Sequence, residues 1–195
     1  MGTKMIKIKN LLFFKIISAF FYFLSVNVAL ANLDLGKSEL STNEELSPDQ
    51  IGNMANINIS GEFNHAYIEQ NSSYKSGNIA SINQNGRNNK SLINQGGEAN
   101  SANIDQYGNS NLAIILQNGN GNNGSISQYG NENEAILSQS GDSLDGSISQ
   151  LGNGNLAYIV DNSSVSMSGY NINQSGQQSL IIINGMNRNI SMTLK

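Results

Sequence analysis

Small, apolar and polar residues alternate in short segments along this chain, and the same segment returns every eleven residues between Gln84 and Asp161. Each segment reads small-x-Ile-x-Gln, or close to it, as at residues 102–106, 113–117 and 124–128. Alternation with period two is the pattern of a β-strand, so the small residue, the aliphatic residue and the Gln share one face. A fixed period of this kind predicts a repeat architecture.

The aliphatic residue and the Gln of each segment are expected to stack on their equivalents inside the fold. We call these positions the core ladder, and its members are Ile82, Gln84, Ile93, Gln95, Ile104, Gln106, Ile115, Gln117, Ile126, Gln128, Leu137, Gln139, Ile148 and Gln150. A Gly follows most of the Gln residues after two positions, and an Asn comes three positions later, as with Gly108 and Asn111. Gly and Asn tolerate positive φ, which a tight corner between short strands requires. Each unit is therefore predicted to be one strand and one corner.

Two observations favour a structural repeat of twenty-two residues, that is, two strands and two corners. The register slips only at two related insertions, 71–77 and 162–169, and both follow strands of the same parity. Tyr107 and Tyr129 also recur in every second unit. Over residues 54–195 the sequence thus predicts an all-β fold, a two-sheet parallel β-solenoid of strand-turn-strand repeats with six strand pairs and a terminal half-repeat.

The last strand admits two registers. Strict spacing puts Lys195 at the Gln position and turns Met192 and Leu194 outward. A shift by one residue turns Ile190, Met192 and Leu194 inward instead, which is physically more sensible because a one-residue slip decides which face is buried.

Residues 1–31 have the features of an export signal. A basic start at residues 4–9 precedes an apolar run over residues 11–28, and residues 29–31 form an A-x-A cleavage site. A membrane anchor is the alternative, since the run is close to spanning length. Polar residues interrupt the run and its small-residue end fits cleavage better, so we expect a signal peptide.

Residues 32–53 carry acidic residues and the only proline, and no eleven-residue register fits them, so we expect a flexible leader that targets the chain for secretion.

Cleavage after Ala31 removes four lysines and leaves six basic against fourteen acidic residues, a mature net charge of −8. That charge argues against a nucleic-acid partner. The absence of cysteine excludes a disulfide framework.

The two predicted sheets differ on their outer faces, three positions before each Gln place. Alternate strands carry there what we call the outer apolar stripe, namely Tyr67, Leu92, Ile114, Ile136, Tyr158 and Ile181. The intervening strands carry Asn or Ser at that position. Strand propensity accounts for any one apolar residue but not for their restriction to one parity. We expect an exposed contact surface, because soluble monomers rarely expose an apolar patch of this length.

The register Gln-x-Gly-x-x-Asn-x-Ala-x-Ile-x-Gln over residues 54–195 resembles the curlin repeats of bacterial curli, the amyloid fibres of biofilms. The leader at residues 34–39 is similar to that of the minor, nucleating curlin subunit, as are the later repeat at 155–159 and the basic ending from Arg188 to Lys195. Asp161 and Asn184 replace the marker Gln and depart from the family pattern.

The resemblance implies an amyloid-forming protein that is secreted through the dedicated outer-membrane curli channel with its accessory factors. It also implies retention at the cell surface and templating of the major curlin subunit into a fimbrium for adhesion and biofilm. We interpret Arg188 and Lys195 as a basic C-terminal tip that attaches an acidic body to the cell surface or an acidic partner, or that merely solvates the chain end.

The alternatives are a major fibre subunit and, more distantly, a carbohydrate-binding β-solenoid adhesin. An enzyme, a cofactor or a metal site is not expected, since the single histidine, His65, stands beside a corner Asn and the carboxylates are scattered. A calcium-binding β-roll needs Asp at a fixed place in each nonapeptide, which this period does not supply. Composition rich in Asn and Gln would suggest disorder, but the strict Ile period argues against it.

Overall fold

The computed structural model describes residues 52–72, 76–162, 169–184 and 189–195. The chain divides into two units, 1–44 and 45–195, and the fold described below belongs to the second. The expected signal peptide, the leader up to residue 51 and Arg188 of the basic tip lie outside the described residues. Within the described ranges, no helix is long and apolar enough to cross a membrane.

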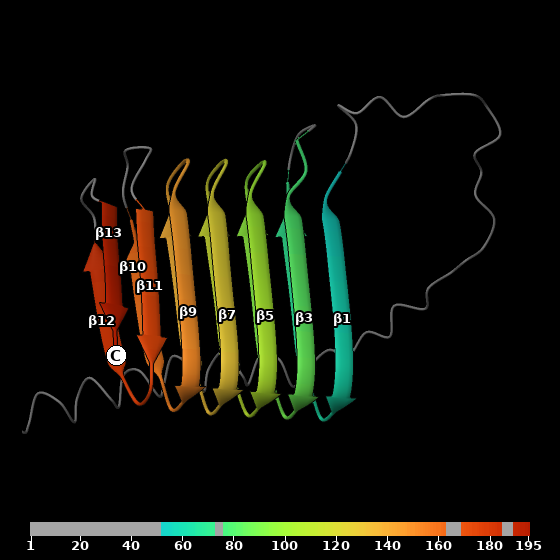
Figure 1. Ribbon diagram of the computed structural model, residues 1–195. Helices are drawn as coiled ribbons and strands as arrows, with labels where there is room; N and C mark the ends of the chain where they lie inside the picture. Colours follow the sequence, from blue (N-terminus) through green and yellow to red (C-terminus); the bar gives the residue numbers. More distant parts are fainter. Residues whose placement is uncertain (1–51, 73–75, 163–168, 185–188) are drawn as a thin grey trace, which may run out of the picture. The chain divides into compact units, whose positions relative to one another are not determined.

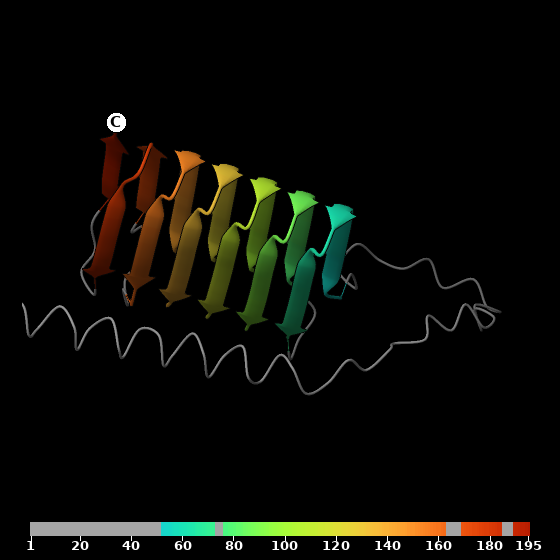
Figure 2. The same cartoon turned by 90° about the horizontal axis from the view of Figure 1, so that it is seen from below.

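The described residues form two parallel sheets that face each other (Figures 1 and 2). Sheet A contains β1 (Met54–Glu62), β3 (Ile79–Arg87), β5 (Ser101–Asn109), β7 (Asn123–Asn131), β9 (Asp145–Asn153), β11 (Gly169–Ser175) and β13 (Asn189–Leu194) in that order. Sheet B contains β2 (His65–Asn71), β4 (Lys90–Gly96), β6 (Leu112–Asn118), β8 (Glu134–Ser140), β10 (Leu156–Asp161) and β12 (Ser179–Asn184). Consecutive strands alternate between the sheets, which confirms the predicted two-sheet parallel β-solenoid.

Strands within a sheet pair in register at equivalent positions of successive repeats. Ile104 pairs with Ile82 on one side and with Ile126 on the other, a step of 22 residues each time. The two insertions lengthen this step to 25 residues between β1 and β3 and to 24 between β9 and β11. Because both insertions lie between strands, they leave the in-register pairing unchanged.

The last strand takes the second of the two expected registers. In β13, Ile190 pairs with Tyr170 and Met192 pairs with Ile172. Ile190 and Met192 are partly buried and pack against the apolar core. Lys195 follows the strand and is exposed. Burial of the apolar side chains therefore decides the register, as a one-residue slip would have exposed them.

An apolar cluster fills the space between the two sheets. It contains the aliphatic members of the core ladder and the alanines two positions before several of them, such as Ala102 and Ala113, and it continues through Ile159, Tyr170 and Ile172. Ile82, Ile104 and Ile126 have no exposed surface. Each fully buried Ile contributes roughly 1.5–3 kcal/mol, and because every strand pair shares its core with its neighbours, the stabilisation grows with stacking.

The corners depend on two residues with positive φ, and only one of them is where the sequence suggests. Gly108 has φ 119°, as expected, but the second positive φ belongs to Ser110 (φ 56°) rather than to Asn111. The same offset recurs at Asn88, which precedes the buried Asn89. The expectation that the corner Asn supplies the left-handed backbone is therefore wrong. That residue is buried and has a hydrogen-bonding role.

Candidate functional site: polar ladders and the two ends of the solenoid

The seven core-ladder Gln residues lie buried between the sheets and bond to one another along the solenoid axis. In sheet A, Gln84 Nε2 donates to Gln106 Oε1 at 2.8 Å, and Gln106 donates in the same way to Gln128. In sheet B, Gln95 Nε2 donates to Gln117 Oε1 at 2.8 Å. Every donor belongs to the strand nearer the N-terminus, so both Gln ladders have a direction.

Each Gln amide also ties the two sheets together. Gln106 Nε2 donates to the backbone carbonyl of Lys90 in sheet B at 3.1 Å, and Gln117 Nε2 donates to the carbonyl of Ser101 in sheet A at 3.0 Å. An interior Gln therefore uses both of its N–H donors and its oxygen. A buried amide needs such complete pairing, since an unmet hydrogen bond there costs about 1–3 kcal/mol.

Two further ladders are formed by the Asn residues that precede the strands. The backbone N–H of Asn111 donates to Asn89 Oδ1 at 3.1 Å, and Asn111 Nδ2 donates to the carbonyl of Gly130 at 2.9 Å. Asn100 has equivalent bonds to Asn78 and to Gly119. Sequence reasoning placed these Asn residues at corners but missed this role. These Asn residues recur every eleven residues, as the Gln residues do, and that shared period was the feature of the sequence that could have predicted the Asn ladders.

The N-terminal end of the solenoid leaves three of these four ladders open. Asn53 and Asn64 begin the two Asn ladders, and each side-chain oxygen accepts the backbone N–H of the next Asn at 2.9 Å. Gln70 begins the sheet B ladder and donates to Gln95 at 2.9 Å. In sheet A the Gln position of β1 is held by Ile59, which pairs with Gln84. The buried Gln84 Oε1 consequently has no hydrogen-bond partner.

Toward the C-terminus all four ladders are interrupted among the described residues, and not all of them in the last repeat. In sheet A, Leu194 of the last strand stands opposite Gln174, and in sheet B, Asp161 of β10 and then Asn184 of β12 take the Gln place. Leu144 follows Asn122 and provides only its backbone N–H. Where the other Asn ladder ends, the buried Asn155 Oδ1 has no partner. The two ends of the solenoid are thus chemically different.

Residues 76–108, 97–130, 108–141 and 130–161 each match the model of the curlin associated repeat. This chain is a curlin repeat protein. No curated protein and no solved structure matches it significantly. The curlin repeat is a structural rather than an enzymatic family, and it is associated with self-assembly into extracellular curli fibres.

The outer apolar stripe of this curlin repeat protein is not continuously exposed. Leu92, Ile114 and Ile136 are only 5–7% exposed, whereas Tyr67 and Ile181 are 43% and 59% exposed. The three buried members do not belong to the cluster between the sheets, so they lie on the outer face of sheet B. Tyr158 is half-buried.

The expectation of an exposed stripe is therefore wrong for its middle members. Part of the reason is their place in the sheet. Ile114 has Leu92 and Ile136 as ladder neighbours on its two sides, and side chains stacked at strand spacing cover each other's flanks. Tyr67 and Ile181 lie in β2 and β12, the edge strands of sheet B, where one side has no such neighbour.

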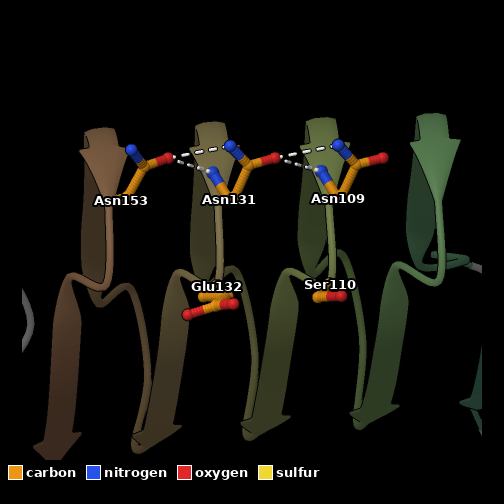
Figure 3. A pocket seen from close by; sticks show the side chains of 5 residues that line it. All are labelled: Asn109, Ser110, Asn131, Glu132 and Asn153. Carbon is orange, nitrogen blue, oxygen red and sulfur yellow. Dashed lines mark hydrogen bonds between the residues drawn. The ribbon is translucent and has the colours of Figure 1, made fainter.

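The outer corners carry a fifth row of amides, shown in Figure 3. Asn109 Nδ2 donates to Asn131 Oδ1, and Asn131 Nδ2 donates to Asn153 Oδ1, both at 2.9 Å. With Ser110 and Glu132 they line a shallow surface hollow. These residues are exposed, apart from the half-buried Asn131, and the three Asn side chains already bond to one another, so they stabilise the corner rather than enclose a ligand.

No grouping suited to a metal ion occurs among the described residues. His65 is exposed at the start of β2. Burial raises the pKa of the Glu134 carboxyl. Its ladder neighbours are Leu112 and Leu156, which exclude water from its sides.

Proposed function

We propose that this protein is a minor curlin subunit that nucleates the assembly of the secreted major subunit into cell-surface amyloid fibres. Nucleation would occur by strand addition at an open end of the solenoid, as in other β-edge templating. The proposal includes secretion through the outer-membrane curli channel and retention at the cell surface, for adhesion and biofilm formation.

One observation carries this proposal, namely the difference between the two ends. A major subunit must join copies of itself many times, so both of its ends should offer matching ladders. At the first repeat Gln70 and the Asn ladders are open, although Ile59 holds the Gln place of sheet A. At the last repeat the Gln is replaced in both sheets, by Leu194 in sheet A and by Asn184 in sheet B. A chain that presents one matching end suits the start of a fibre better than its interior.

The major fibre subunit is the second candidate, and the regular interior of the solenoid favours it. From β3 to β9 the pairing advances by 22 residues without interruption, which is what an indefinitely extended fibre needs. Stoichiometry distinguishes the two functions. A nucleator should be scarce in purified fibres, whereas a major subunit should account for most of their mass.

The direct test adds this protein, without residues 1–31, to a freshly desalted major curlin subunit at a small molar fraction. A dye that binds amyloid reports the lag before fibre growth. We expect a dose-dependent shortening of the lag. Ile104→Asp is the matched control, since an unpaired charge in the dry interior should prevent folding of the template. An unchanged lag with wild-type protein would contradict the nucleator function.

A further inference from the structure

We propose that templating is polar: the N-terminal end of the solenoid, formed by β1 and β2, receives the last repeat of an incoming curlin chain, and the C-terminal end terminates stacking. This rests on the proposed function and deepens it by naming the end and the chemistry that it recognises. The direction of the hydrogen bonds in the ladders carries the inference.

The N-terminal end presents acceptors and donors that the next curlin repeat would satisfy. Gln70 donates its Nε2 inward, to Gln95 and to the carbonyl of Met54, so its oxygen is left for a Gln Nε2 from outside. The backbone N–H groups of Asn53 and Asn64 stand where interior Asn residues receive an Asn Oδ1 from the preceding repeat, as Asn111 does from Asn89. The required partner therefore carries Gln and Asn in its final repeat.

Apolar surface at the same end favours covering by another repeat. Ile57 and Ile59 point toward the space between the sheets, yet each remains 44% exposed because β1 is the edge strand of sheet A in the described part of the chain. Their equivalents in the interior, such as Ile82, have no exposed surface. Stacking of one more repeat would bury this surface at about 25 cal/mol per Å².

The C-terminal end lacks the complementary groups. An incoming chain that stacked on β13 would meet Leu194 where the ladder of sheet A needs a Gln Nε2. A second copy of this chain is a poor partner for Gln70 in sheet B, because the last sheet B strand of that copy, β12, carries Asn184 in place of a ladder Gln. The structure therefore favours a different curlin chain with regular ladder residues as the occupant of the N-terminal end.

Cysteine cross-linking tests this polarity directly. The chain contains no cysteine, so single substitutions report one position each. Asn58 in β1 and Thr193 in β13 belong to the same outward-facing ladder at opposite ends, and both are exposed. Asn58→Cys and Thr193→Cys are thus a matched pair. Stacked repeats bring equivalent Cα atoms to about 5 Å, which is within the range for a disulfide.

Each variant is mixed with a freshly desalted major curlin subunit that carries one cysteine at the equivalent outward position of either its last or its first repeat, and the mixture is oxidised. We expect Asn58→Cys to cross-link to the last repeat with a yield at least about tenfold above any Thr193→Cys product, since each unmet buried amide costs about a factor of ten. Equal yields, a preference for Thr193→Cys, cross-linking to the first repeat at Asn58, or no cross-link at either end would overturn the polarity.

A second substitution examines the ladder itself. Gln70→Leu added to Asn58→Cys removes the open acceptor and should lower the cross-link yield about tenfold. Glu69→Leu, at the exposed neighbouring position of the same strand, is the control and should leave the yield unchanged. Equal yields from both variants would contradict recognition through the Gln ladder.

The lag experiment and the cross-linking experiment together separate failure of the nucleator function from failure of the polarity. If the wild-type protein does not shorten the lag while Asn58→Cys still cross-links to the last repeat, the polarity holds and the nucleator function does not. If the wild-type protein shortens the lag but Asn58→Cys does not cross-link to the last repeat, the nucleator function holds and the polarity does not.

Discussion

At the residue scale, glycine makes the close stacking of repeats possible. A Cβ added to Gly108 would lie 2.0 Å from the carbonyl oxygen of Gly130 in the next repeat, and Gly130 stands in the same relation to Gly152. These glycines also have positive φ, 119° at Gly108. Both the backbone conformation and the space exclude a side chain, because a backbone carbonyl cannot move away without breaking the ladder.

Gly108→Ala should therefore be far more disruptive than Gly121→Ala. Gly121 also has positive φ, 66°, but an added Cβ there would meet only Ser143 Oγ at 3.6 Å. We expect a loss of more than about 3 kcal/mol at Gly108 from the clash and of about 1 kcal/mol at Gly121 from backbone strain alone. The guanidinium midpoint for dissolving assembled fibres measures the difference. Similar midpoints for the two variants would show that the close approach is relieved by movement of the corner.

Burial makes Glu134 a pH-dependent element of stability. Its pKa is raised by desolvation, and its buried Oε1 has no hydrogen-bond partner. Because the folded state then holds the proton more tightly than the unfolded state, stability should fall as the pH rises from below the ordinary Glu pKa through the raised one.

Glu134→Gln should remove this fall and raise stability at neutral pH. Fibre-dissolution midpoints from pH 3 to about pH 8 provide the profile. Glu132→Gln, at an exposed corner, is the control and should leave the slope in place. A Glu134→Gln profile with the wild-type slope would assign the pH dependence to another group.

At the element scale, the strands were predictable and their hydrogen-bonding direction was not. Alternation of Ile and Gln with period two, repeated every eleven residues, was enough to predict the parallel pairing of Gln106 with Gln84 and Gln128. It could not show that Asn111 bonds through Asn89, because a periodicity indicates which residues share a face but not which atoms bond between repeats. The same limit applies to the outer stripe. Sequence assigned Ile114 to the outer face but did not predict its burial.

Adjacent residues of β3 offer a test of the two faces. Ile82 has no exposed surface, and Ser81 lies next to it on the outer face of sheet A, where it is half-buried. Ile82→Asp should abolish assembly, since a carboxylate placed in an apolar interior without a partner costs several kcal/mol. Ser81→Asp should assemble with a lag within about twofold of wild type, because its charge stays hydrated. Light scattering and dye binding follow both. Equal effects of the two substitutions would contradict the assignment of faces.

Asn103, also on the outer face of sheet A, makes a less suitable control. Its Nδ2 donates to Asp105 Oδ2 at 2.8 Å, so Asn103→Asp would place two carboxylates side by side. Sequence alone predicts that Asn103 and Ser81 tolerate a charge equally well, since both hold the same outward position of the repeat. The hydrogen bond of this one pair distinguishes them.

At the scale of the whole molecule, the middle of the solenoid is the most regular part and the two ends differ most. An interior repeat contacts a neighbour on both sides, so most of its ladder groups are met within the chain. Two exceptions lie before the last repeat, where Leu144 replaces a ladder Asn and the buried Asn155 Oδ1 has no partner. At the ends themselves, Gln70 leaves an acceptor open and Leu194 replaces a ladder Gln. Unlike ends of this kind make stacking at the two ends unequal.

The two ends should accordingly serve different purposes, and removal of residues 186–195 separates them. The deletion takes away β13 and both members of the basic tip, Arg188 and Lys195. Because β1 and β2 remain, seeding of a major curlin subunit should persist with a lag within about twofold of the full-length protein. Retention on the cell surface should be lost, since the basic tip is the candidate attachment of an acidic chain to an acidic partner.

The double variant Arg188→Ser with Lys195→Ser distinguishes charge from structure in that deletion. It keeps the strand whose Ile190 and Met192 cover the last core positions, and it removes only the two positive charges. If the charges attach the protein, fractionation of cells and medium will find the double variant in the medium, as with the deletion. Release by the deletion alone would assign attachment to the β13 edge. Normal retention of both would remove the C-terminal end from attachment and leave it only as the place where the ladders stop.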